Sequence, residues 1–175
     1  MHLSFAISPA NEADFLTHWA AKYNYPNGKK YTNNIGKPLT PQSVMELYGW
    51  KNGTGDELSA KKRRSVEANY PHDFAGDESA RYLDHKKDGG AIWNIFFLHC
   101  LKPAAWPIFD QHTFRAMHYL KTGQIKEIGT TNRQKYVQYA EYRKFHASLS
   151  GASARTVDMA LFAFGQFLKL AEPYV

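Results

Sequence analysis

Apolar residues along the chain recur at the spacing of three and four residues that is typical of α-helices. After Asn11, a residue type that caps helices, Phe15, Leu16 and Trp19 form one apolar stripe. Near the other end of the chain, the same spacing relates Val157, Ala160, Leu161, Phe164 and Leu168. Sustained strand-like alternation and hairpin dipeptides are scarce. The pattern predicts a compact all-α protein of roughly seven to nine helices.

Turn residues and caps divide this pattern into segments. Thr40-Pro41 supplies an N-cap and a first-turn proline, and Thr54-Gly55-Asp56-Glu57 matches a capping box. The polar stretch 28–37 has no clear period and predicts a loop. Helices are expected from Asn11 to before Asn24, after Thr40, from the capping box to before Pro71, over 78–85, 91–102, 110–119 and 131–149, and after Gly151.

The segment 91–102 is apolar on almost all sides, which predicts a helix buried at the centre of the protein. A connector over 103–107 holds Trp106, and Asp110 begins the next helix. An aspartate at this position commonly caps the free amides of the helix. A carboxylate among apolar and aromatic groups also loses hydration, which prepares it to stabilise a developing cation or to activate water. Position alone favours the cap over the catalytic role.

Charge is distributed unevenly along the 175 residues. The chain has 22 Lys and Arg against 16 Asp and Glu, a formal net charge of +6. The stretch from Gly28 to Ser65 contains three acidic residues, Glu46, Asp56 and Glu57. It contains a larger set of basic residues, namely Lys29, Lys30, Lys37, Lys51, Lys61, Lys62, Arg63 and Arg64. Such a surface favours a polyanionic partner, because contacts with phosphates release condensed counterions. For the run 61–64, a solvated helix face is the alternative interpretation.

The residue inventory excludes several classes of site. The single Cys100 excludes a disulfide framework within one chain, a four-cysteine zinc site and a cysteine-ligated iron–sulfur cluster. His99, His112 and His118 lack the spacing of a helical zinc site, so no metal and no cofactor are expected. The apolar run 91–101 is shorter than the roughly 20 residues that span a bilayer, and the start of the sequence does not resemble a secretory signal. A cytoplasmic protein without membrane contact is expected, and a nucleoid-associated one if it binds DNA.

Two segments resemble the helix–hairpin–helix/Gly-Pro-Asp (HhH-GPD) superfamily of DNA glycosylases, which includes the endonuclease-III-like and 8-oxoguanine glycosylases. Within 88–121, a glycine turn, a buried helix, a proline and an Asp-x-His-x-x-Arg motif follow in the family's order, here as Gly90, 91–101, Pro107, Asp110, His112, Phe114 and Arg115. The segment 155–168 resembles the family's late helix with its apolar-Gly pattern. The resemblance implies a single all-α, two-lobed domain over 1–175. One lobe covers about 36–122, and the other combines 1–35 with 123–175.

Departures from the family pattern narrow the activity that the resemblance implies. The turn Lys87-Asp88-Gly89-Gly90 lacks the hydrophobic residues of the family hairpin. Ile92 stands where strand-cleaving members carry a lysine. The resemblance therefore implies a monofunctional glycosylase of base-excision repair, without a lyase step and without an iron–sulfur cluster.

In this interpretation Asp110 stabilises positive charge on the sugar of a nucleotide flipped out of double-stranded DNA. Residues expected to contact the substrate are Trp93, Trp106, Phe109 and His112, although the aromatic ones suit core packing equally. Residues expected to contact DNA are Gly89, Gly90, Lys29, Lys30, Lys61, Lys62, Arg63 and Arg64. Two other classes stay open: a non-catalytic DNA-binding protein on a degenerate glycosylase scaffold, and an interaction protein with no nucleic-acid role.

Overall fold

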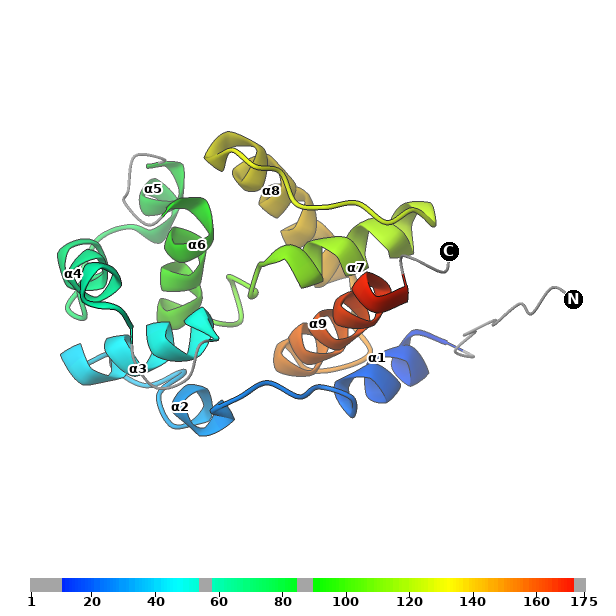
Figure 1. Ribbon diagram of the computed structural model, residues 1–175, viewed down its shortest axis with the longest axis horizontal. Coiled ribbons are helices and arrows are strands. Elements are labelled where there is room, and N and C mark those ends of the chain that lie inside the picture. Colours follow the sequence, from blue (N-terminus) through cyan, green and yellow to red (C-terminus); the bar gives the residue numbers. More distant parts are fainter. Residues whose placement is uncertain (1–10, 54–57, 85–89, 172–175) are drawn as a thin grey trace, which may run out of the picture.

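The computed structural model describes residues 11–53, 58–84 and 90–171, and these residues form nine α-helices and no β-strand (Figure 1). The helices are α1 Glu12–Ala20, α2 Gly28–Thr32, α3 Pro41–Asn52, α4 Ala60–Asn69, α5 Glu78–Leu83, α6 Gly90–Leu101, α7 Gln111–Thr122, α8 Asn132–Ser148 and α9 Ala154–Ala171. The prediction of a compact all-α protein is confirmed over these residues. None of the helices formed by the described residues is long and apolar enough to cross a lipid bilayer.

Side-chain caps begin several helices where the sequence predicts them. The hydroxyl of Thr40 accepts a hydrogen bond from the amide of Ser43, and the Ser43 hydroxyl accepts one from the amide of Thr40, so α3 starts with a capping box. Thr131 starts α8 in the same way. The capping box expected at 54–57 lies outside the described residues, and Ser59 caps α4.

Residues 28–32, which were expected to lie in a loop, form the short helix α2. Tyr31 anchors this helix, because its ring centroid lies 4.5 Å from that of Trp50 and its hydroxyl lies 2.8 Å from Nε2 of His99. The Nδ1–H of His99 donates to the carbonyl of Trp106 at 2.7 Å, so Nε2 accepts from Tyr31. These partners are distant in sequence, and tertiary contacts of this kind override weak local patterns.

The buried apolar residues form two clusters that share α6. The α9 cluster joins α1, α7, α8 and α9, and its fully buried members are Leu16, Ile95, Leu98, Ala116, Tyr139, Tyr142, Ala160 and Leu161. The α3 cluster joins α2, α3 and α4, and its fully buried members are Leu47, Tyr48, Val66 and Phe97. Figure 1 shows α2, α3 and α4 on one side of α6 and α7, α8 and α9 on the other. Helix α6 is therefore buried on both faces, as its apolar sequence predicts.

Helix α7 belongs to the α9 cluster through Phe114 and Met117, although the predicted lobe 36–122 groups it with α3. The lobe boundaries themselves stay a prediction. Helix α9 passes so close to the first turn of α7 that an ideal Cβ on Gly165 would lie 2.0 Å from the carbonyl oxygen of His112. This contact places the start of α7, and with it the candidate site, relative to α9.

Candidate functional site

Asp110 is the N-cap of α7, and its cap holds the carboxylate in one position. Oδ1 accepts hydrogen bonds from the amides of His112 at 2.9 Å and Thr113 at 3.1 Å. The Thr113 hydroxyl in turn accepts from the amide of Asp110 at 3.0 Å, which completes a capping box. The side chain nevertheless stays 18% exposed. The capping role is confirmed, and it leaves Oδ2 directed away from the helix.

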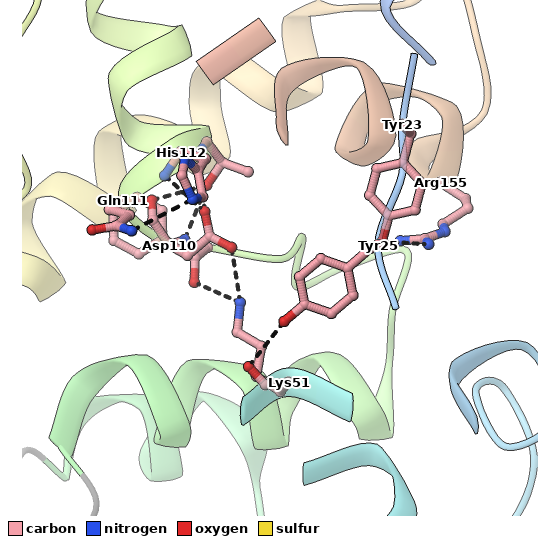
Figure 2. Close-up of polar contacts among 9 residues, drawn as sticks. Tyr23, Tyr25, Lys51, Asp110, Gln111, His112 and Arg155 are labelled. Atoms are coloured by element: carbon pink, nitrogen blue, oxygen red, sulfur yellow. Dashed lines mark hydrogen bonds and ion pairs between the residues drawn. The ribbon is translucent and has the colours of Figure 1, made fainter. Parts of the chain in front are cut away.

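Lys51, near the end of α3, meets this free oxygen (Figure 2). Its Nζ lies 3.1 Å from Oδ2 of Asp110 and donates a second hydrogen bond to the carbonyl of Phe109 at 3.4 Å. The lysine side chain is only 8% exposed, so water screens this ion pair weakly. Sequence reasoning included Lys51 only in the basic excess, because nothing local relates residues that are 59 positions apart.

The charge state of Asp110 follows from opposing effects. Burial raises the pKa of this carboxyl, but the Lys51 ammonium, His112 and the Thr113 amide together outweigh burial and hold the pKa below its usual value. Asp110 is therefore a carboxylate at neutral pH. Burial lowers the pKa of His112, whose Nδ1 accepts a hydrogen bond from Arg115 at 3.2 Å. The imidazole of His112 is therefore neutral at neutral pH, and its charge adds to that of Lys51 only at lower pH.

A small cavity of about 20 Å³ opens beside Asp110 where α3, α7, α9 and the segment after α1 meet. Its described lining consists of Tyr23, Tyr25, Trp50, Lys51, Ile108, Asp110, Thr113, Arg155, Asp158 and Phe162. A cavity of this size holds one water molecule. Three kinds of group converge on it: two carboxylates, two cations and several aromatic rings.

The aromatic and cationic walls of this cavity are interlocked. The guanidinium of Arg155 stacks 4.2 Å from the ring centroid of Tyr31 and 5.0 Å from that of Tyr23, and it donates to the Tyr23 hydroxyl at 3.2 Å. Tyr25 donates its hydroxyl to the carbonyl of Lys51 at 3.3 Å. Burial and the nearby Asp110 raise the pKa of Tyr25 to about 12, so its hydroxyl stays a donor. Figure 2 shows Tyr23, Tyr25 and Arg155 on one side of the Asp110–Lys51 pair.

The aromatic residues expected in the pocket pack into the hydrophobic clusters. Trp106 is 5% exposed and lies between Tyr82 and Arg143, whose guanidinium is 4.0 Å from the tryptophan ring. Phe109 is 1% exposed within the α9 cluster, and Trp93 packs on the α3 cluster. None of these three belongs to the described lining of the cavity. His112 lies at its edge, with its ring 4.9 Å from that of Phe162.

Of the residues that line the cavity with rings and charges, sequence reasoning singled out Asp110 as a candidate site residue and did not identify Tyr23, Tyr25 or Asp158. Tyr23, Tyr25 and Trp50 come from the ends of separate elements, and Asp158 lies inside the apolar pattern of α9. One sequence signal pointed to Asp158: it lies on the apolar face of a helix, and an aspartate is rarely buried at such a position unless it has a partner or a function.

A larger groove of about 530 Å³ runs between α8 and the start of α9, but Asp110 is not among its described lining residues.

The basic residues predicted to meet DNA lie on α2 and α4, two helices that contact α3. All four side chains of the run Lys61, Lys62, Arg63 and Arg64 on α4 are exposed. Lys62 donates a hydrogen bond to Asn52, the neighbour of Lys51 in sequence. Lys30 of α2 shares a hollow of about 100 Å³ with Arg63, and Lys29 next to it is exposed. The structure thus brings Lys30 and Arg63 together against the first half of α3, whereas Lys62 reaches the last residue of that helix.

The glycine turn before α6 is described only in part, because Gly89 lies outside the described residues. Gly90 has a φ of +76°, which favours glycine, and a Cβ there would lie 3.0 Å from the side chain of Asn132. The next amide, that of Ala91, donates to Oδ1 of Asn132 at 3.1 Å. This amide of α6 is therefore satisfied within the protein, and a phosphate would have to displace Asn132 to reach it.

In the described part of the chain, no group of three or more His, Cys, Asp or Glu side chains is placed to hold a metal ion. The site is instead an ionised carboxylate held between a helix N-terminus and a lysine, beside an aromatic cavity and a basic surface. Comparison of the chain with protein-family models, with curated proteins and with solved structures finds no match.

Proposed function

We propose that this protein is a monofunctional DNA glycosylase of the HhH-GPD type, which hydrolyses the N-glycosidic bond of a damaged or modified base flipped out of double-stranded DNA. One observation carries the proposal: Asp110 is an ionised, immobilised carboxylate at a cavity lined by aromatic rings and cations. Loss of a base leaves positive charge on the sugar, and a fixed anion stabilises that charge without reorganising.

The surroundings of Asp110 suit a nucleic-acid substrate. Aromatic rings stack on bases, and Tyr23, Tyr25 and Phe162 offer such surfaces within the cavity wall. The basic residues of α2 and α4 lie along α3, whose Lys51 pairs with Asp110, and would contact the phosphates. A base is far larger than the cavity of about 20 Å³, so binding requires the wall to open. Tyr25, in the segment between α1 and α2, is the wall residue best placed to move.

Base release from a panel of duplexes tests this proposal. Each duplex carries one oxidised, alkylated or deaminated base, and alkali converts each abasic product into a strand break. We expect breaks after alkali treatment and none without it, because a monofunctional enzyme leaves the sugar–phosphate chain intact. Asp110→Asn keeps a side chain that caps helices but removes the negative charge, so release slows by roughly 100- to 1,000-fold.

Asp77→Asn is the matched control, because Asp77 is the N-cap of α5 and its Oδ1 accepts from the amide of Ala80. It makes the same chemical change at a helix cap that is not part of the candidate site. We expect this variant to release base at the rate of the wild type. An Asp110→Asn variant that is as fast as the wild type would refute the role of Asp110.

A non-catalytic DNA-binding protein is the second candidate, and one observation favours it: both oxygens of Asp110 already have partners within the protein. It predicts salt-dependent DNA binding that Lys61→Glu combined with Arg64→Glu weakens, together with no base release from any duplex. If the double variant binds DNA as tightly as the wild type, the basic surface of α4 has no role in either candidate function.

A further inference from the structure

Asp158 on α9 is a second carboxylate at the cavity beside Asp110, and the proposed function so far leaves it unused. It is 4% exposed, and it shares the cavity lining with Asp110 and Thr113. Burial together with the charges of Asp158 and Asp110 raises the pKa of Tyr142, so both carboxylates act on the same hydroxyl. Carboxylates are rarely buried without a partner, and this one lies among aromatic and apolar side chains.

The partner nearest to Asp158 is His146 of α8. Its Nε2 lies 3.2 Å from Oδ1 of Asp158, within ion-pair distance. Among the described residues, however, neither of these two buried atoms has a partner in hydrogen-bonding geometry. A buried polar atom without a hydrogen bond is costly, and ordered water usually satisfies such atoms. Asp158 therefore has unused capacity to accept a hydrogen bond.

The cavity is also lined by Asp158, and it offers a place for a water molecule that donates to the Asp158 carboxylate. Its volume of about 20 Å³ fits a single water molecule, and its lining includes a carboxylate from α7 and one from α9. Hydrolysis of a glycosidic bond commonly uses two carboxyl groups with separate roles, one of which can activate water. Lys51 pairs with Asp110 and keeps it ionised, whereas the described residue nearest to the Asp158 carboxylate is His146 and not a lysine.

We propose that the cavity holds the attacking water and that Asp158 is the general base that takes its proton. The inference rests on the proposed function, in which Asp110 stabilises the cationic sugar. The bond between C1′ and the base nitrogen breaks, and its electron pair leaves with the base. The water oxygen forms a bond to C1′, and one water proton passes to the Asp158 carboxylate. The departing base takes up a proton from solvent.

Substitution of Asp158, followed by rescue with azide, tests the base role. A general base contributes typically about 100- to 10,000-fold, so Asp158→Asn slows single-turnover base release by at least roughly 100-fold. Asp158→Ala slows release likewise and makes room for a small anion. Azide attacks without losing a proton, so it restores release by Asp158→Ala and forms an azido sugar that mass spectrometry detects. Azide does not rescue Asp110→Asn, because that variant lacks the charge that stabilises the cation.

Three further measurements separate the outcomes. Melting temperatures show that each variant is folded, and Asp77→Asn is again the matched control at the N-cap of α5. A crystal structure of the wild type should show a water within hydrogen-bonding distance of Asp158 in the cavity, and an empty cavity would overturn the inference without reference to activity. If the wild type releases base and Asp158→Asn releases it equally fast, this inference is overturned and the proposed function stands. If Asp158→Ala is folded but azide does not restore base release, the inference is likewise overturned. If the wild type releases no base, both the inference and the proposed function are overturned.

Discussion

Replacing Gly165 with alanine would disturb the contact that places α7 against α9. An ideal Cβ at this position lies 2.0 Å from the carbonyl oxygen of His112 and 2.6 Å from its carbonyl carbon. Both atoms belong to the backbone, so no side-chain rotation relieves the contact. Real Cβ contacts are essentially never shorter than 3.0 Å, so the first turn of α7 has to move by about 1 Å.

The expected cost follows from two opposing effects. Overpacking a well-packed interface costs about 1–3 kcal/mol, and a clash with backbone lies at the upper end of that range. Alanine stabilises a helix interior by about 1 kcal/mol relative to glycine, which offsets part of the cost. A net loss of about 2 kcal/mol remains, and it lowers the melting temperature of a protein of this size by roughly 4–8 °C. The same movement shifts the Asp110 carboxylate, and a displacement of about 1 Å at a catalytic group can slow a reaction about 100-fold.

Thermal unfolding followed by circular dichroism measures the first effect, and the base-release assay measures the second. Gly28→Ala is the matched control, because a Cβ at Gly28 in α2 meets no other described atom within 4 Å. We expect that variant to melt within about 1–2 °C of the wild type, since a glycine-to-alanine change at a compatible helix position is neutral or slightly stabilising. If Gly165→Ala also melts with the wild type, then the close approach of α9 to α7 is wrong.

Three other predictions follow from named contacts. Burial lowers the pKa of His99 to about 4, below its ordinary 6.5, so the folded state binds fewer protons than the unfolded state. The free energy of unfolding, measured with urea, therefore decreases by up to about 3 kcal/mol as the pH falls from 6.5 towards 4. His99→Gln removes this pH dependence. In Lys51→Met, burial dominates at Asp110 and raises the pKa of its carboxyl above the usual value, which carbon-detected NMR titration will show. Arg115→Met removes a buried guanidinium that donates to the carbonyl of Gly165 at 2.8 Å and pairs with the carboxylate of Glu127, and losing these charge-assisted hydrogen bonds costs about 1.5–3 kcal/mol in urea unfolding.

Much of the fold follows from local rules. The caps at Thr40, Asp110 and Thr131 are readable from sequence, because a cap depends on a residue and its neighbour three positions on. Helix α6 is readable as buried because it has apolar residues on all sides. Helix α2 was missed, since its five residues are polar and are stabilised through Tyr31 by distant contacts.

The candidate site divides in the same way. Asp110 stood out because a motif and a helix start coincide there, and the structure adds Lys51 and Asp158 to it. Trp93, Trp106 and Phe109 were expected in the pocket on the basis of nearness in sequence. Their side chains instead fill the hydrophobic clusters, because adjacent positions along a connector or a helix face different directions.

The sequence by itself determined the all-α class, most helix starts, the buried central helix and the capped carboxylate of Asp110. These features depend on residues within a few positions of one another, where backbone geometry fixes which groups meet. The tertiary structure alone decided that Lys51 of α3 pairs with the ionised Asp110, and that Asp158 of α9 lines the same cavity. At Gly165, α9 passes close to the start of α7 and so brings Asp158 and Asp110 towards each other. The packing of one helix on another depends on shape complementarity, which no local sequence pattern encodes.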